Sequence, residues 1–169
     1  SGAVLNNAAG VMTITNSAFI GNRAGNVGGA LTNNTLSTVS ITNSTFAGNN
    51  GSNGGGGIAI LGAGTTSITN SIVWGNNGNT LTGATITYSI IEGGFAGTGN
   101  LNVDPLFVSP QAFTSAPTSA GNYRLQDSSP AVDAGSNAAV PVDTFDVNGN
   151  ASTTDEAPDV DGNPRRYDD

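Results

Sequence analysis

The sequence of 169 residues contains no cysteine, no histidine and no lysine. Without them the chain cannot form a disulfide, a Ser-His, Cys-His or Ser-Lys catalytic system, or a zinc site with soft ligands. Charged residues make up only 9% of the chain, against about a quarter in ordinary soluble domains. No apolar run approaches the ~20 residues of a membrane-spanning helix, so no membrane insertion is expected in this segment.

Positive charge is also scarce. The four basic residues are arginines that form no patch in the sequence, and the formal net charge is -8. Phosphate backbones are bound through Lys and Arg, so a nucleic-acid partner is not expected. The charge is unevenly distributed, because residues 1–91 contain one charged side chain, Arg23, and all twelve acids follow from Glu92 onward. A neutral region is therefore followed by an acidic one.

The neutral region repeats a nonapeptide of the pattern Ile-Thr-Asn-Ser-x-Phe-x-Gly-Asn. Copies begin at residues 14, 41 and 68, which are 27 residues apart. A degenerate copy begins 18 residues later, at residue 86. A second marker of the Gly-Ala-Leu type begins at residues 2, 29 and 56, in phase with the first. A period of this length is typical of a solenoid.

In the four residues before each Asn-Ser pair, and before Tyr88-Ser89, one set of alternate positions is mostly apolar and the other is all Ser or Thr, which is the periodicity of a strand. Three short strands and three corners in each 27-residue repeat predict an all-β fold, a parallel β-helix of about five or six coils. Equivalent residues of successive coils then stack in internal columns. The two predicted apolar columns are Ile14/Ile41/Ile68/Ile86 and Phe19/Phe46/Val73/Ile91.

Asparagines recur at two corners of each coil and predict hydrogen-bonded ladders of side-chain amides. The two columns are Asn16/Asn43/Asn70 and Asn22/Asn49/Asn76. The alternative is that some of them serve only as turn residues. We expect β-helix coils over residues 1–94, with the last coil shortened, terminal coils of the same helix over 95–135, and an irregular Asp/Gly/Pro-rich segment over 136–169.

Several motifs resemble those of known bacterial surface proteins. Gly28-Gly29-Ala30-Leu31 and Phe46-Ala47-Gly48-Asn49 resemble the repeats of polymorphic outer-membrane-protein β-helices. Four later motifs resemble the closing segment of choice-of-anchor surface domains in the pectate-lyase-like superfamily; they begin at Asp104, Tyr123, Ser129 and Asp161. The resemblance implies a right-handed parallel β-helix on an exported, extracellular or cell-surface bacterial protein. Such domains continue past Pro-Arg into a further strand and an anchor, and the chain opens in mid-repeat at Ser1, so we expect a piece of a longer or processed precursor.

The predicted function is that of a non-catalytic structural β-helix, acting as an adhesin, a spacer or a fibre subunit. The second alternative is a polysaccharide lyase or hydrolase, since many pectate-lyase-like relatives cut polysaccharides. The repeat coils offer neither a basic residue with calcium nor paired carboxylates. Four of the acids that follow could in principle pair, namely Glu92, Asp104, Asp127 and Asp133, but the resemblance assigns Asp104 and Asp133 to folding. No catalytic residue is predicted.

The first alternative is a carbohydrate- or ice-binding module, because Ser and Thr form two outward columns on one strand face. The candidate binding residues are Thr13, Thr15, Ser40, Thr42, Ser67, Thr69, Thr85 and Thr87. Some ice-binding β-helices present such a lattice of threonines. The alternative explanation is that Ser and Thr suit exposed strands generally.

Two acidic loops space oxygen ligands around a glycine, as in loops that bind hard cations such as calcium. The candidate ligands are Asp146, Asn148, Asn150, Asp159, Asp161 and Asn163. Asx-turns explain both loops equally well. Asparagine-linked glycosylation is a further prediction, at sequons headed by Asn33, Asn43, Asn50 and Asn150.

The last prediction concerns partners. A β-helix end exposes unpaired backbone groups that must be covered. Another copy of the chain, stacked head-to-tail, would produce a filament; preceding coils of a longer chain are the alternative. Glycans are the other candidate partners.

Overall fold

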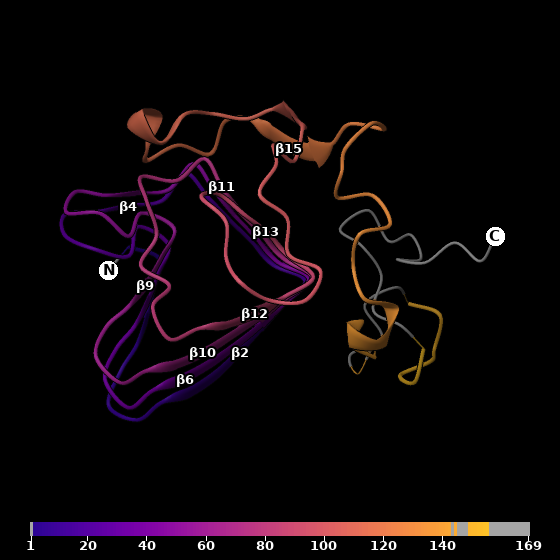
Figure 1. Cartoon of the computed structure of the whole chain (residues 1–169), viewed down its shortest axis with the longest axis horizontal. Coiled ribbons are helices and arrows are strands. Elements are labelled where there is room, and N and C mark those ends of the chain that lie inside the picture. The colour runs from indigo at the N-terminus through magenta and orange to yellow at the C-terminus, as the bar shows by residue number, and fades with distance from the viewer. Residues whose placement is uncertain (1, 143, 145–148, 156–169) are drawn as a thin grey trace.

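The fold is a parallel β-helix, as a computed structural model of the chain shows; it describes residues 2–142, 144 and 149–155. The all-β prediction is confirmed. Coils of decreasing size follow one another and overlap when viewed along the stack (Figure 1). Coil 1 contains β1 (Val4–Asn6), β2 (Val11–Thr15), β3 (Ala18–Ile20) and β4 (Arg23–Ala24). Coil 2 contains β5 (Leu31–Asn33), β6 (Thr38–Thr42), β7 (Thr45–Ala47) and β8 (Asn50–Gly51). Coil 3 contains β9 (Ile58–Ile60), β10 (Thr65–Thr69) and β11 (Ile72–Trp74), and coil 4 contains β12 (Thr85–Thr87) and β13 (Ile90–Ile91).

Equivalent strands of successive coils pair in parallel and form the walls of the helix. The three large sheets have the orders β1-β5-β9, β12-β10-β6-β2 and β13-β11-β7-β3, and β4 pairs with β8. The register follows the sequence repeat, with Ile14 opposite Ile41 and Ile41 opposite Ile68. After the nine-residue deletion in coil 4, Ile68 still lies opposite Ile86. The deletion therefore falls outside the sheet that carries the isoleucines.

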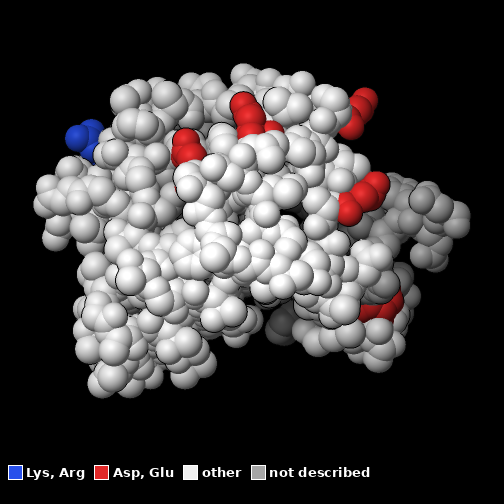
Figure 2. Space-filling model, in the orientation of Figure 1, with Lys and Arg blue, Asp and Glu red and all other residues white. Residues whose placement is uncertain are grey.

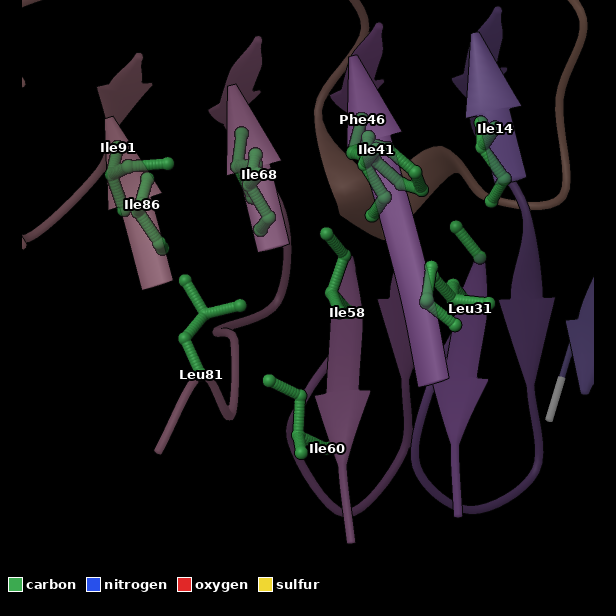
Figure 3. Close-up of a cluster of buried hydrophobic side chains, with 13 residues drawn as sticks. Ile14, Leu31, Ile41, Phe46, Ile58, Ile60, Ile68, Leu81, Ile86 and Ile91 are labelled. Atoms are coloured by element: carbon green, nitrogen blue, oxygen red, sulfur yellow. The ribbon is translucent and has the colours of Figure 1, made fainter. Parts of the chain in front are cut away.

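The two predicted apolar columns form the core. Ile14, Ile41, Ile68 and Ile86 are all buried and lie on successive strands (Figure 3). In the second column Phe46 is fully buried, and its ring stacks on Phe19 with a centroid separation of 4.7 Å and an interplanar angle of 7°. Each coil covers the apolar face of its neighbour, so the stability of the core depends on stacking rather than on any one coil.

One of the two predicted asparagine ladders is confirmed. The Asn22 side-chain amide donates to Asn49 Oδ1 at 2.9 Å, and the Asn49 amide donates to Asn76 Oδ1 at 2.9 Å. The same oxygens also accept the backbone N–H groups of Asn22 and Asn49. Asn49 is fully buried and the column is continuous, so the ladder joins coils 1, 2 and 3 from inside.

The other predicted ladder is wrong, because Asn16, Asn43 and Asn70 are corner residues. Their φ angles are 50°, 50° and 51°, a left-handed conformation that asparagine tolerates better than most residues. No hydrogen bond joins their side chains; the Asn70 side chain instead bonds the backbone of Ser136. Tyr88 takes the same corner in coil 4 with φ 50°. At this corner the asparagines therefore serve as turn residues, which is the alternative that the sequence left open.

The serine that follows each of these asparagines joins the coils instead. The backbone N–H groups of Ser17, Ser44 and Ser71 each donate to the hydroxyl of the serine in the next coil, at 3.2, 3.1 and 3.1 Å. Each hydroxyl in turn donates to a carbonyl two residues back in its own coil. Both hydrogen-bonding functions of the hydroxyl are used, so this corner is fixed without an amide ladder.

The prediction that residues 95–135 form terminal coils of the helix is wrong beyond the start of a fifth coil. Leu101 pairs in parallel with Ile90, but β14 (Phe107–Ser109) and β15 (Asn122–Leu125) are antiparallel to each other. In the described residues the helix therefore has four coils and the start of a fifth, against the five or six expected. The repeat pattern ends before this region, and prolines at 105, 110 and 117 cannot donate to a coil-to-coil ladder. Two short 3-10 turns complete the described elements, η1 (Phe113–Ser115) and η2 (Asn137–Ala139).

Residues 104–125, which we call the strap, run back along the outside of the helix to coil 1. In Figure 1 the strap's β15 lies outside the outline of the coils, beyond β11. The Thr118 N–H donates to the Gly21 carbonyl at 3.0 Å, and the Tyr123 hydroxyl accepts from the Gln111 N–H at 3.1 Å. A Cβ added at Gly21 would lie 2.2 Å from the Thr118 carbonyl oxygen. The glycine of the repeat therefore allows the strap to approach the wall closely.

Gly48→Ala is expected to cost more stability than Gly75→Ala. Both glycines have left-handed backbones, with φ of 65° and 66°, so each alanine costs about 1–2 kcal/mol in strain. A Cβ at Gly48 would also lie 2.9 Å from the Tyr123 hydroxyl and 3.0 Å from the Gln111 carbonyl, whereas a Cβ at Gly75 meets nothing within 4 Å. Crowding should add about 1–3 kcal/mol at Gly48 alone, measured as the free energy of unfolding in urea. Equal losses in the two variants would show that the strap does not rest on this wall.

Candidate functional site

The predicted binding residues lie together in one array. The outer surface of the β12-β10-β6-β2 sheet carries two columns of hydroxyls in register, which we call the hydroxyl face. One column is Thr13, Ser40, Ser67 and Thr85, and the other is Thr15, Thr42, Thr69 and Thr87. All eight side chains are exposed or half-buried, while the isoleucines between the columns are buried. The predicted arrangement of these residues in two columns is confirmed, and binding by them stays a prediction.

The chemistry of the hydroxyl face is neutral and polar. Thr69 and Thr87 lie close enough for a hydrogen bond, with 3.3 Å between their hydroxyl oxygens, so part of the bonding capacity is used within the array. A third column continues the surface at one side as Val11, Thr38 and Thr65, and Val11 is 83% exposed. Such a surface offers hydroxyl donors and acceptors beside methyl groups to a flat ligand. It supplies no ionisable group for proton transfer.

The acids singled out in the sequence are placed as backbone caps or turn residues. The Glu92 carboxylate accepts the Gly75 N–H at 2.8 Å, and Asp104 accepts the Leu106 N–H at 2.8 Å. Asp133 lies in a turn with φ 56°. Within the described ranges no three His, Cys, Asp or Glu residues gather where they could hold a metal ion. In the view of Figure 2 the acidic side chains are scattered over a largely uncharged surface.

The candidate calcium loops are mostly beyond the described residues. Asp146, Asn148, Asp159, Asp161 and Asn163 all lie outside them, and only Asn150 is described. Its Oδ1 accepts the Ser152 N–H at 2.8 Å, and its amide donates to Asp155 at 2.6 Å. The first of these bonds is that of an Asx-turn. Calcium binding by these residues stays a prediction.

Two of the four asparagines predicted to carry glycans have a buried side-chain nitrogen. Asn33 is fully buried, and its Nδ2 donates to Ser37, Thr65 and Thr66. The Nδ2 of Asn43 is buried as well. A glycan on the Asn33 nitrogen would have to occupy the packed interior, and the Asn43 nitrogen is covered although the residue is half-buried at a corner, so neither nitrogen is accessible in the folded coil. Asn50 is half-buried and accepts a bond from Asn77, and Asn150 is exposed, so glycosylation at these two sites stays a prediction.

Sequence reasoning missed a second buried asparagine column. Asn6 donates to Asn33 Oδ1 at 3.1 Å, and Asn33 donates to the hydroxyl of Thr66 at 3.0 Å. Thr66 points inward at a position where coil 2 has Val39, and the amide of Asn33 satisfies it. The signal was available, because Asn6 and Asn33 are 27 residues apart. The sequence instead predicts Asn33 to be the head of a sequon.

No similar protein identifies the function of this site. The part of the chain that the structure describes contains no helix long and apolar enough to span a membrane. Comparisons with protein-family models, with curated proteins and with solved structures find no match.

Proposed function

We propose that the protein is a non-catalytic structural β-helix, extracellular or at the cell surface, that acts as a spacer or as the scaffold of an adhesin. The proposal rests on one observation: the recurring polar residues form hydrogen bonds between neighbouring coils. Two sets of residues bond to the neighbouring coil, namely the repeated serines and the asparagine ladder of Asn22, Asn49 and Asn76. The residues that the repeat retains in each coil therefore hold a solenoid together.

Two further features support this proposal. Glu92 and Asp104, two of the acids that could have paired for hydrolysis, each accept a backbone N–H, and the hydroxyl face carries no charge. The resemblance to choice-of-anchor domains of the pectate-lyase-like superfamily adds the location, an exported bacterial protein. A right-handed winding and glycans as partners belong to the same proposal.

The purified chain is expected to leave polysaccharides intact. Acidic and neutral polysaccharides, with and without added calcium, are incubated with the protein and assayed for unsaturated products and for new reducing ends. Depolymerisation that is lost in Glu92→Gln or Asp127→Asn, while the fold is retained, would establish an enzyme and overturn the proposal. Arg23→Gln serves as a control, because it removes the one charge of the repeat region without touching an acid.

A second candidate function is binding through the hydroxyl face, and the observation that favours it is the register of its two columns. If this face binds ice or a carbohydrate, Thr42→Lys places a long charged side chain in the middle of the array. Thermal hysteresis, or glycan-array binding, should then be lost. Thr82→Lys is the matched control, because Thr82 is exposed but lies outside the face. Equal activity in both variants would exclude the face.

A further inference from the structure

A cleft lies where the wall of the helix is shortened between coils 3 and 4. The connection from Asn49 to Ala59 contains β8 and takes ten residues, whereas the equivalent connection from Asn76 to Thr80 takes four. The cleft beside this shorter connection has a volume of about 520 Å³. Sites that bind small molecules typically have volumes of ~300–1,000 Å³. Its lining residues all lie between Asn76 and Phe95, so the cleft is formed by the interior of the chain and not by either terminus.

The floor of the cleft is the end of the hydrophobic core. Leu81 and Ile91 line it, and both are buried members of the core cluster (Figure 3). Phe95 lines the cleft as well; it is half-buried and packs against the same cluster. The chain reaches Phe95 through a turn at Gly93 and Gly94, whose φ angles of 86° and 80° favour glycine. The Gly94 N–H donates to the Ile91 carbonyl at 3.0 Å, so this turn holds the aromatic ring beside the cleft.

Two polar side chains of the cleft have complementary unused groups. Glu92 accepts the Gly75 N–H with Oε2 at 2.8 Å, and no described residue donates to its Oε1. Asn79 accepts the Ile58 N–H with Oδ1 at 3.1 Å, and no described residue accepts a bond from its Nδ2. One hydrogen bond thus orients each side chain. It leaves an acceptor on Glu92 and a donor on Asn79 for a ligand.

We propose that this cleft binds one neutral saccharide ring of a glycan. A sugar hydroxyl both donates and accepts, so neighbouring hydroxyls of one ring donate to the Glu92 carboxylate and accept from the Asn79 amide. The C–H face of the ring packs on Phe95 and Leu81, whose side chains carry no polar atom. The inference rests on the proposed function, in which glycans are the partners, and gives them a site apart from the hydroxyl face.

The charge and the donors of the cleft fit other small ligands less well. Glu92 is the one charged residue among the lining residues, so an acidic sugar or a phosphate would meet a carboxylate with no cation to offset it. An ammonium group carries donors only, so it would satisfy Glu92 and place a donor against the Asn79 amide. No three His, Cys, Asp or Glu residues of the described ranges gather where they could hold a metal ion. One acceptor beside one donor therefore matches a neutral hydroxylated ligand.

The test follows the backbone amide signals of the complete chain by NMR during titration with the methyl glycosides of glucose, galactose and mannose. At least one of them should shift the amides of Gly78, Gly93 and Gly94 in a saturable way, because these glycines line the cleft. The uronic acid that corresponds to this glycoside should bind about tenfold more weakly or less, because its carboxylate would face Glu92.

Two conservative substitutions examine the polar pair. Glu92→Gln retains an oxygen for the Gly75 N–H and should weaken binding about tenfold, because a neutral acceptor replaces a charged one. Asn79→Asp retains the oxygen that accepts the Ile58 N–H but replaces the free donor by an acceptor, so it should weaken binding of the neutral glycoside as well. Unchanged signals from the strands of coils 1 and 2 show that each variant remains folded.

A lysine in each of the two candidate binding surfaces separates them. Thr82 is exposed and lines the cleft, so Thr82→Lys should fill the cleft and abolish the shifts of its glycines. Thr42 lies on the hydroxyl face, so Thr42→Lys should leave these shifts unchanged. If the hydroxyl face were the glycan site, the two variants would have the opposite effects.

The proposal is overturned if none of the three glycosides gives saturable shifts in the folded protein, or if the shifts survive in Thr82→Lys. Propylamine that binds in the cleft, and binds more tightly to Asn79→Asp, would assign the cleft to a cationic ligand. Shifts confined to the hydroxyl face and lost in Thr42→Lys would assign glycans to that face and leave the structural β-helix standing. Cleavage of a glycoside that shifts the cleft amides would support the site and overturn only the non-catalytic function.

Discussion

Replacing Phe46 by alanine is expected to reduce the free energy of unfolding by about 3–5 kcal/mol, the range for deleting a buried aromatic side chain. The ring is fully buried, stacks on Phe19 on one side and lies in register with Val73 on the other. The alanine leaves a cavity between three coils, and the coils cannot move together because their backbones are hydrogen-bonded at fixed spacing. Urea denaturation followed by circular dichroism gives the value.

Two variants show whether stacking between coils is the cause. Phe19→Ala removes the same side chain from the partly exposed position of coil 1, so it should cost less than half as much. Phe46→Leu retains most of the buried volume and should recover much of the loss. If Phe19→Ala were as costly as Phe46→Ala, burial between neighbouring coils would not be the source of the stability.

Much of the fold could be predicted because each coil repeats the chemical environment of the one before. In a stack, a residue and its equivalent 27 positions later meet the same neighbours, so identical residue types at that spacing indicate identical positions. Ile14, Ile41 and Ile68 lie opposite one another for this reason. The shortened coil was also predictable, since the repeat keeps its strand residues while nine others are missing.

The strap could not be predicted, because it obeys no repeat. Its position depends on contacts between segments far apart in the sequence, such as Thr118 with Gly21. Tyr123-Arg124-Leu125 belongs to β15, and a strand of this length does not reveal its partner. Phe107 pairs with Leu125 in antiparallel register, and the segment between them contains Pro110 and Pro117. Periodicity gives no information about such a segment.

The corner asparagines show a second limit on what the sequence repeat can predict. Asn16 and Asn22 recur with the same spacing, yet one column is needed for its backbone conformation and the other for its side-chain bonds. The repeat alone does not separate these reasons. The hydroxyl face shows the converse: its geometry was predictable from alternation, but a regular neutral surface does not identify a ligand.

Replacing Asn49 by alanine is expected to cost about 3–5 kcal/mol, because several bonds of a fully buried side chain are lost at once. Its Oδ1 accepts the backbone and side-chain N–H groups of Asn22, at 2.8 and 2.9 Å. Its amide donates to Asn76 Oδ1 at 2.9 Å and to the Phe19 carbonyl at 2.8 Å. The substitution deprives polar groups of coil 1 of partners inside the wall, where water does not readily replace them.

Asn53 provides a matched control for this effect. It belongs to the same coil, and its amide also donates to an asparagine 27 residues away, Asn26, at 2.8 Å. That pair is exposed, so water can replace the bond and Asn53→Ala should change stability by less than about 0.5 kcal/mol. Hydrogen exchange separates the two variants further, because only Asn49→Ala should accelerate exchange of the Asn22 amide. Equal losses in the two variants would mean that the ladder stabilises the corner through backbone conformation and not through buried hydrogen bonds.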